Sequence, residues 1–385
     1  MKAKLIHRVI GAGTLASLLL WACGPAPAAQ STAPVAASME NTITPEPTQI
    51  SSPTAQASIT PEPAQISFPF QVGTPLPSLT ETITPENVAN IIEVARWDLG
   101  GVRTFTFAPD GKGLLIGTTN GKLMLVRITD GELVQSLEGH AKSVSSLAYS
   151  ADGHFIVSGS LDKTIRVWKV SDGSELHVLE GHEDAVTSVA ISRDGQTIAS
   201  GSTDNTIRIW SFSDGKLLKT LKGDFIGATS LSFSADGSTL ASGGADDTAR
   251  VWDVVSGTQL QSFAYRPILG GETYTVQVEY SPDGALLAGR HSYTGMLTLY
   301  SASDYSEIVT MPIPGLKNSD FVFSPDGQML IAGAKDSGLN FVNIEDGTAL
   351  KRIELGNIKA VAISPDGTLV AVMGDDYFVH IWGLQ

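Results

Sequence analysis

The stretch that decides the fold is GHEDAVTSVAISRDGQTIASGSTDNTIRIW, which runs from Gly181 to Trp210. It holds a histidine, several serines and several aspartates, which are the side chains of a hydrolase triad. It also alternates short β-branched runs, such as VTSVAIS, TIAS and TIRIW, with turn residues, which is typical of β-strands. The number of times this pattern occurs in the chain distinguishes an active site from a structural unit.

A tetrapeptide that ends in Asp-Gly recurs seven times along the chain, as APDG, SADG, SRDG, SADG and three copies of SPDG. The seven glycines are separated by 42, 42, 42, 47, 43 and 40 residues. This period, with short strands and tight Asp-Gly turns in each unit, is typical of propeller blades. The sequence therefore predicts an all-β fold, a seven-bladed β-propeller of four-stranded antiparallel blades over residues 88–385. The seven glycines are Gly111, Gly153, Gly195, Gly237, Gly284, Gly327 and Gly367.

The strand that closes the ring is expected to come from the other end of the chain. Unit seven supplies strands near Ile358–Ile363, Leu369–Val372 and Phe378–Trp382, and the sequence then ends at Gln385. The stretch from Ile91 to Trp97 reads as a strand without a blade. We expect it to complete blade seven, which removes an exposed sheet edge and joins the two ends of the propeller.

The units resemble those of the WD40 family, which carry Gly-His, then a Ser or Thr, an Asp and a Trp at fixed spacing. Counting five, nine and fifteen residues from the Asp-Gly glycine gives such a set in units two, three and four. Gly-His precedes units two and three, whereas unit four has Gly223-Asp224. Units one, five and six match weakly. The matching residues are His140, Ser158, Asp162 and Trp168; His182, Ser200, Asp204 and Trp210; Ser242, Asp246 and Trp252; and, in unit seven, Asp376 and Trp382.

The resemblance implies that these side chains form an internal hydrogen-bond network rather than a triad. A nucleophile occurs once, exposed and beside an oxyanion hole, whereas this set recurs in step with the blades. A buried Asp that accepts from a His and a Ser, with the Trp N–H as a further donor, would satisfy each polar group. We therefore predict no catalytic residue in the repeated set.

The charge of the chain argues against nucleic-acid binding. The 385 residues include 25 Lys and Arg against 40 Asp and Glu, a net charge of -15. Such a surface repels a phosphate backbone, because nucleic-acid binders carry a basic stripe.

The N-terminus reads as an export signal over residues 1–22. Lys2, Lys4 and Arg8 form a basic start, and the apolar run from Val9 to Leu20 is shorter than a typical transmembrane helix. The following Trp21-Ala22-Cys23 resembles a bacterial lipobox, although Trp21 is bulkier than the usual residue. We expect lipidation of Cys23 and attachment to the extracytoplasmic face of the cell membrane. The alternative is an ordinary secretory signal with an incidental cysteine.

Residues 23–87 are expected to form a disordered linker. Twelve of the nineteen prolines lie there, with no Lys or Arg, and ITPEPTQIS is nearly repeated as ITPEPAQIS. Such a composition cannot bury enough apolar surface to offset its chain entropy. The alternative is a proline-rich tract that binds a partner.

Other motifs indicate neither catalysis nor a cofactor. Ser160-Leu161-Asp162-Lys163 matches S-x-x-K of penicillin-binding enzymes, but it falls on a predicted turn and no KTG follows. No calcium-loop pattern accompanies the Asp-Gly turns, and the seven histidines are too scattered for zinc. We expect no metal and no cofactor.

Two departures in unit five suggest a partner-binding surface. The longer step into this unit adds residues near Phe263–Tyr274, and one more residue is inserted in the next turn. These segments are rich in Tyr and Arg, which dominate binding hot spots, so a peptide or glycan is a fitting ligand. The alternative is simple drift of blade five. The candidate binding residues are Tyr265, Arg266, Tyr274, Arg290, His291 and Tyr293.

Two functions remain open from the sequence. The first is a non-enzymatic protein-interaction platform, expected to be monomeric and tethered to the outer face of a bacterial membrane. The second is an extracytoplasmic hydrolase or glycan-processing propeller with its site in the central channel. The two differ in whether His and carboxylate side chains from three or more blades converge in the channel.

Overall fold

The computed structural model describes residues 72–223, 227–264, 276–291, 295–313, 320–335 and 338–384. The predicted signal, Cys23 and most of the predicted linker lie outside these residues. No helix in the described ranges is long and apolar enough to span a membrane.

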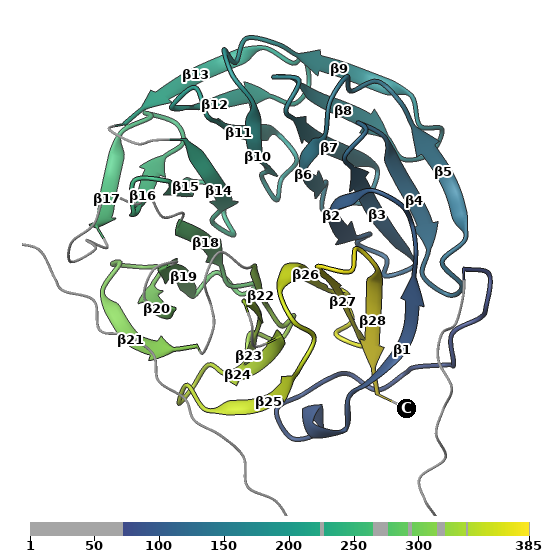
Figure 1. The fold of residues 1–385 in the computed structure, drawn as a ribbon. Coiled ribbons are helices and arrows are strands. Elements are labelled where there is room, and N and C mark those ends of the chain that lie inside the picture. Colours follow the sequence, from purple (N-terminus) through teal and green to yellow (C-terminus); the bar gives the residue numbers. More distant parts are fainter. Residues whose placement is uncertain are drawn as a thin grey trace, which may run out of the picture. The chain divides into compact units, whose positions relative to one another are not determined.

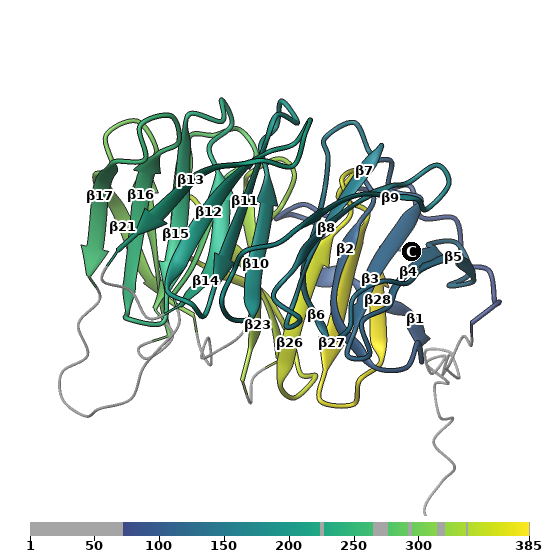
Figure 2. The ribbon, with the colours of Figure 1, turned by 90° about the horizontal axis from the view of Figure 1, so that it is seen from above.

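The described chain forms seven separate four-stranded antiparallel sheets, which confirms the predicted fold. Figure 1 shows the sheets as blades around a centre, with the first strand of each repeat innermost. Figure 2 shows the strands of successive blades standing side by side around the ring. Strand order within blades one to six follows chain order, so each blade is a meander joined by short turns.

The first three blades contain twelve strands. They are β2 (Val102–Phe107), β3 (Gly113–Thr118), β4 (Leu123–Arg127) and β5 (Leu133–Leu137) in blade one; β6 (Val144–Tyr149), β7 (Phe155–Ser160), β8 (Ile165–Lys169) and β9 (Glu175–Leu179) in blade two; and β10 (Val186–Ile191), β11 (Thr197–Ser202), β12 (Thr206–Ser211) and β13 (Leu217–Lys222) in blade three.

The next three blades follow the same order. They are β14 (Ala228–Phe233), β15 (Thr239–Gly244), β16 (Thr248–Asp253) and β17 (Gln259–Ala264) in blade four; β18 (Val276–Tyr280), β19 (Leu286–His291), β20 (Met296–Ser301) and β21 (Glu307–Pro312) in blade five; and β22 (Phe321–Phe323), β23 (Met329–Ala334), β24 (Gly338–Asn343) and β25 (Ala349–Ile353) in blade six.

The repeated S-x-D-G tetrapeptide forms the turn between the first two strands of a blade. In blade three, Ser192 Oγ donates to Asp194 Oδ1 at 2.6 Å and accepts the N–H of Thr197, the first residue of β11. Gly195 has φ +69°, a left-handed conformation that glycine adopts without a Cβ clash. The turn therefore uses a carboxylate and a glycine at fixed spacing, with a serine hydroxyl in every blade except blade one, which has Ala108.

Each blade buries both faces against its neighbours. Along β11, Ile198 packs into a cluster with blade two, whereas the next residue, Ala199, packs into a cluster with blade four. Successive side chains on a strand point to opposite faces, so a sheet covered on both sides reads as a continuous apolar run. This packing explains why the second strand of each blade lacks polar alternation.

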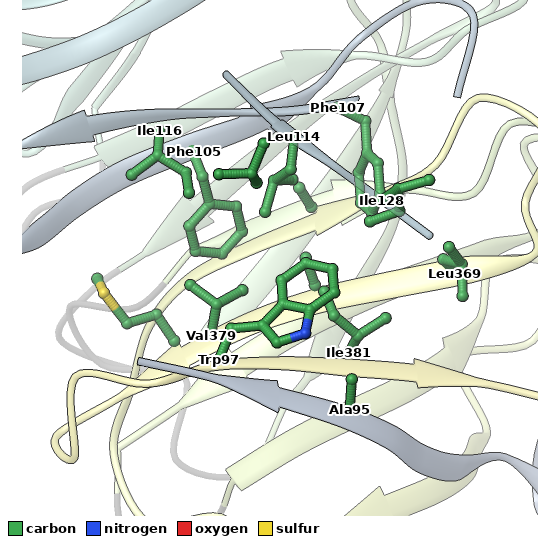
Figure 3. Packing of buried hydrophobic residues seen from close by; sticks show 14 of the residues in the cluster. Ala95, Trp97, Phe105, Phe107, Leu114, Ile116, Ile128, Leu369, Val379 and Ile381 are labelled. Carbon is green, nitrogen blue, oxygen red and sulfur yellow. The ribbon is translucent and has the colours of Figure 1, made fainter. Parts of the chain in front are cut away.

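Blade seven is completed from the start of the propeller, as predicted. Strand β1 (Ile92–Trp97) pairs antiparallel with β28 (Val379–Gly383), which follows β26 (Ile358–Ile363) and β27 (Leu369–Gly374). Trp97 is fully buried between blades seven and one. Figure 3 shows its indole beside Val379 and Ile381 of β28, with Phe105 and Leu114 of blade one opposite.

The predicted linker ends earlier than expected, because residues 72–90 pack against the propeller. Leu76 N–H donates to a carbonyl between β4 and β5 of blade one, and Ile83 N–H donates to Gly367 in blade seven. Ile83 and Val88 are buried, and Val88 begins the short 3-10 helix η1 (Val88–Asn90) beside β25 of blade six. Isolated apolar side chains in a proline-rich segment show no periodicity, so this packing could not be predicted from the pattern of residues.

Removing the closing strand should open the ring. A chain that begins at Asp98 lacks β1, which leaves the edge of β28 unpaired and exposes the cluster around Trp97. We expect self-association and a lower melting temperature, measured by light scattering and thermal unfolding. A chain that begins at Val72 is the matched control and should behave as the full chain does. A monomeric, equally stable chain from Asp98 would contradict the closure.

Candidate functional site

The network predicted from the repeat is formed in blade three. Trp210 Nε1 donates to Ser200 Oγ at 2.8 Å, and Ser200 Oγ lies 2.8 Å from His182 Nε2. His182 Nδ1 lies 2.7 Å from Asp204 Oδ2, which also accepts the N–H of Glu183. Because an ionised Asp only accepts, Nδ1 carries the proton and Nε2 accepts from the serine hydroxyl.

The same network occurs in blade two with nearly the same distances. Trp168 Nε1 lies 2.9 Å from Ser158 Oγ, which is 2.8 Å from His140 Nε2, and His140 Nδ1 is 2.9 Å from Asp162 Oδ2. Although the order Ser, His, Asp is that of a triad, both serines are 0% exposed. A Trp N–H occupies each serine oxygen, so neither can reach a substrate.

Burial and hydrogen bonding set the charge states in this network. Burial lowers the pKa of His182, which keeps its imidazole neutral, and the nearby Asp204 only partly offsets this effect. Burial alone would raise the pKa of Asp204, but hydrogen bonds from Thr206 and His182 hold it below its ordinary value. The pair is thus a neutral imidazole and a carboxylate, each fully partnered.

Blade four keeps the network in an altered form, because unit four lacks the Gly-His histidine. Trp252 Nε1 still donates to Ser242 Oγ at 2.8 Å. Asp246 instead binds Arg250, whose Nη2 lies 2.7 Å from its Oδ2. Arg250 lies four residues after the aspartate on the adjacent strand β16, so a cation from within the blade replaces the imidazole.

Blade seven uses a histidine at the position of Arg250. His380 Nε2 lies 2.9 Å from Asp376 Oδ2, and its Nδ1 lies 2.7 Å from Glu93 Oε1 on the closing strand β1. The side chain therefore links the blade aspartate to the strand that completes the ring. Sequence reasoning missed both His380 and Arg250, although their shared spacing from the aspartate could have revealed them.

Trp382 does not join the network that was predicted for it. Its Nε1 is buried without a hydrogen-bond partner among the described residues. The reason is Val372, which occupies the position of Ser200 and offers no hydroxyl. Trp382 contributes through packing alone, in the cluster between blades six and seven.

The S-x-x-K motif forms no catalytic pair. Ser160 Oγ donates to the carbonyl of Lys142, and Lys163 Nζ donates to the carbonyl of Glu183. Lys163 has φ +78° in the turn before β8, in keeping with the predicted position. No group of His, Cys, Asp and Glu in the described ranges could hold a metal ion.

The central channel contains a polar cavity of about 410 Å³ to which all seven blades contribute. Hydroxyl groups at its wall join neighbouring blades: Ser145 Oγ donates to the carbonyl of Val186, and Thr229 Oγ1 to that of Val276. In blade five an amide replaces the hydroxyl, since Gln277 Nε2 donates to Asp320 Oδ1 and to the carbonyl of Phe321 in blade six.

Arg290 lies in this cavity wall and not in a turn, which corrects its predicted position. It belongs to β19 opposite Gln277 and is 4% exposed. Six residues after the Asp-Gly glycine, blades one to four and six all have glycine. At Gly201 a Cβ would lie 2.7 Å from Ala228 of the next blade, whereas blade seven has the buried Met373 at this position. Blade five places an arginine there, beside the three-residue inner strand β22 of blade six.

Two carboxyl groups in this part of the channel, Asp320 and Glu279, have raised pKa values. Burial raises the pKa of Asp320 to about 6, against the opposing charge of Arg290 and the hydrogen bond from Gln277. Asp320 keeps some accessible surface, and it lines the polar cavity of the channel. Burial also raises the pKa of Glu279 well above its ordinary value, and the charge of Asp320 adds to this effect. Burial lowers the pKa of Arg290 to about 10, so it stays charged at neutral pH.

The other predicted binding residues are not brought together by the described structure. Tyr265, Arg266, Tyr274 and Tyr293 lie outside the described residues, and His291 is the last residue of β19. Phe263, expected in the inserted loop, belongs to β17, and its ring lies 4.1 Å from that of Tyr300.

The sheets, their closure and the repeated network define the protein as a seven-bladed β-propeller. Residues 131–169, 173–211, 215–253 and 351–383 match the family model described as WD domain, G-beta repeat. The chain is therefore a propeller that contains WD40 repeats, and the matches fall on the units with the strongest resemblance.

The chain is also similar to an uncharacterized WD repeat-containing protein of Synechocystis sp. The two are 29% identical over 128 residues, which cover 32% of this chain and 36% of that protein. The matched part thus spans about a third of the relative's length.

Truncating the network aspartate should destabilise the protein. Asp204→Ala leaves the buried donors of His182 and Thr206 without their acceptor, at a cost of about 1–3 kcal/mol, or more for a charged acceptor. The free energy of unfolding from urea denaturation measures this loss. The matched control is Glu183→Ala, which removes an exposed neighbouring carboxylate and should change stability by less than about 0.5 kcal/mol. An unaltered Asp204→Ala variant would contradict the network's role.

The imidazole of His182 should make the protein less stable at acid pH. Its folded pKa is lowered from 6.5, so below that pH the unfolded chain binds the extra proton. The contribution of neutral His182 to folding stability is therefore complete above pH 6.5 and is lost as the pH falls. Asp320 and Glu279, whose pKa values are raised, stabilise the folded state as the pH falls. The effect of His182 is therefore measured as the difference in unfolding free energy between wild type and a His182 variant. The stability gap between wild type and His182→Gln should narrow from pH 7.5 to pH 5.5; a gap that widens would contradict it.

Proposed function

We propose that this protein is a non-enzymatic protein-interaction platform, held by a lipid on Cys23 at the outer face of a bacterial membrane. WD40 propellers suggest interaction scaffolds, and the sequence of the first 23 residues supports the tether. The main observation behind the proposal is that the network residues bond to one another. The His, Ser and Asp side chains that could perform chemistry are partnered inside blades two and three.

A rigid ring suits this role, because it presents loops and a channel mouth without rearranging. Blades are joined by continuous apolar clusters, by hydroxyl and amide bonds across the inner strands, and by the shared blade seven. A preorganised surface loses little conformational entropy on binding.

The hydrolase alternative requires histidines and carboxylates from three or more blades in the channel. The described lining of the polar cavity contains one carboxylate, Asp320, and no histidine. The lining of a second cavity farther along the channel, next to Arg193, adds neither among the described residues. The channel thus supports binding better than general acid and base catalysis.

Replacing the lipidation residue should release the protein from membranes. Cys23→Ser removes the thiol that would carry the acyl chains, and the mature chain has a net charge of -18, counting 22 basic against 40 acidic residues, which does not favour anionic lipid. We expect the variant in the aqueous phase of a detergent partition and the wild type in the detergent phase. A Cys23→Ser variant that stays in the detergent phase would refute the tether.

The platform itself is tested by capture. Mild crosslinking in intact cells, followed by purification of the full chain, should recover a stoichiometric protein partner. Asp204→Ala, which acts on stability, should reduce capture only in proportion to the folded fraction. Turnover of an ester or glycoside by the purified chain, without any captured protein, would favour the hydrolase.

A further inference from the structure

The channel wall between blades five and six contains a buried cation, Arg290, which interacts electrostatically with Asp320. Nε and Nη1 of Arg290 are buried and have no hydrogen-bond partner among the described residues. The described structure also contains no ion pair between Arg290 and Asp320. A buried guanidinium that lacks a partner is costly, so its place in a solvent-connected cavity indicates a ligand-binding role.

The position of Arg290 strengthens this reading. The equivalent residue is glycine in blades one to four and six, where a Cβ would collide with the next blade, as at Gly159 and Gly333. Blade seven has Met373 at this position, buried against blade one, whereas Arg290 lines the channel cavity and blade six begins its inner strand at Phe321. The ring would close with glycine there, so packing alone does not require the charge.

The other cation of the cavity is already neutralised. Lys359 Nζ lies 3.0 Å from Asp375 Oδ1 and 4.1 Å from the centre of the Tyr377 ring. Among the described lining residues, Arg290 is therefore the cation without an ion pair, and guanidinium groups pair well with carboxylates.

Asp320 determines what must accompany the carboxylate. Gln277 donates to its Oδ1, the backbone N–H groups of Phe321 and Val361 also lie near the carboxylate, and the side chain lines the cavity. It would repel a bare anion, whereas a ligand with an N–H next to its carboxylate satisfies both Arg290 and Asp320. The C-terminus of a peptide has this arrangement, because its last amide N–H lies close to the terminal carboxylate.

The size and lining of the cavity fit a chain end. A volume of about 410 Å³ within a ring of strands admits an extended segment end-on and excludes a folded surface. Ser188 lines the same space and its hydroxyl can bond to a further backbone amide, whereas Ser146 Oγ already accepts the N–H of Val189 and Ser230 Oγ is bonded to the backbone of Val278.

We propose that the channel mouth binds the C-terminal carboxylate of a partner peptide, with Arg290 facing the carboxylate and Asp320 accepting the terminal amide N–H. This inference rests on the proposed interaction function, since it specifies the kind of partner that the platform takes. A free amino acid has a related carboxylate and donor, so the test separates the two sources.

The minimal probe is N-acetylglycine, which has a carboxylate and one adjacent amide N–H. Its binding to the full chain is measured by saturation-transfer NMR and titration, beside N-acetylglycinamide, acetate and glycine. We expect N-acetylglycine to bind at least about tenfold more tightly than each of the other three, because each lacks the carboxylate, lacks the amide N–H, or replaces that N–H with a hydrated ammonium. Equal binding of the glycinamide or of acetate, or tighter binding of glycine, would overturn the proposal.

The decisive variant is Arg290→Gly, which introduces the glycine that blades one to four and six have at this position and should leave the fold intact. We expect it to weaken N-acetylglycine binding at least about tenfold. Arg193→Gln, which removes an exposed arginine at the second channel cavity, is the charge-matched control and should bind as the wild type does. Arg290→Met, which keeps most of the side-chain volume, replaces the glycine variant if thermal unfolding shows that the latter is not folded. Unaltered binding by a folded Arg290 variant would overturn the site.

Capture in cells separates this inference from the platform function. If Arg290→Gly loses both the probe and the partner, the carboxylate site is the capture site. If the wild type captures a partner but does not bind N-acetylglycine, the platform stands and the carboxylate site is wrong. If the wild type binds the probe but captures no protein, the partner-peptide assignment fails and so does the platform.

Discussion

The structure depends on one packing constraint, which is that every blade must bury both of its faces. A four-stranded sheet with Ile198 on one face and Ala199 on the other is stable only between two neighbours. A row of such sheets would end in an exposed face at each terminus, so the ring must close. The pairing of β1 with β28 and the burial of Trp97 follow from this requirement. The segment over residues 72–90 adds further bonds across blades one, seven and six.

Burial on both faces creates a second requirement, because each polar side chain inside a blade needs a partner. Blades two and three satisfy it with a histidine from the preceding loop. Blades four and seven satisfy it with Arg250 and His380, which project from the strand after the aspartate. The conserved element among these blades is an aspartate with a nitrogen donor, and the source of the donor varies. Hydrogen bonding to a buried carboxylate, not catalysis, accounts for the repeated His, Ser and Asp.

Blade five departs from this scheme in the channel, where architecture does not explain its residues. Gln277 takes over the link between blades, and Arg290 occupies a position that is glycine in five other blades. The resulting wall combines a charged guanidinium with an aspartate whose pKa is raised to about 6. Polar groups with shifted pKa values in a cavity are typical of binding sites. The proposed carboxylate site thus lies where the repeat is broken.

The sequence by itself determined the number of blades, their turns and their closure, because these depend on short-range patterns. Ser192, Asp194 and Gly195 form a turn wherever they occur at that spacing, and a β-branched run forms a strand in every unit. The network of blades two and three was also predictable, since its members recur at fixed distances. The packing of residues 72–90, the replacement of the histidine by Arg250 and His380, and the place of Arg290 were decided by the tertiary structure. Each depends on contacts between blades or between strands. Such contacts depend on whether a neighbouring residue leaves space or an unpaired charge, and the period of the repeat carries no information about that.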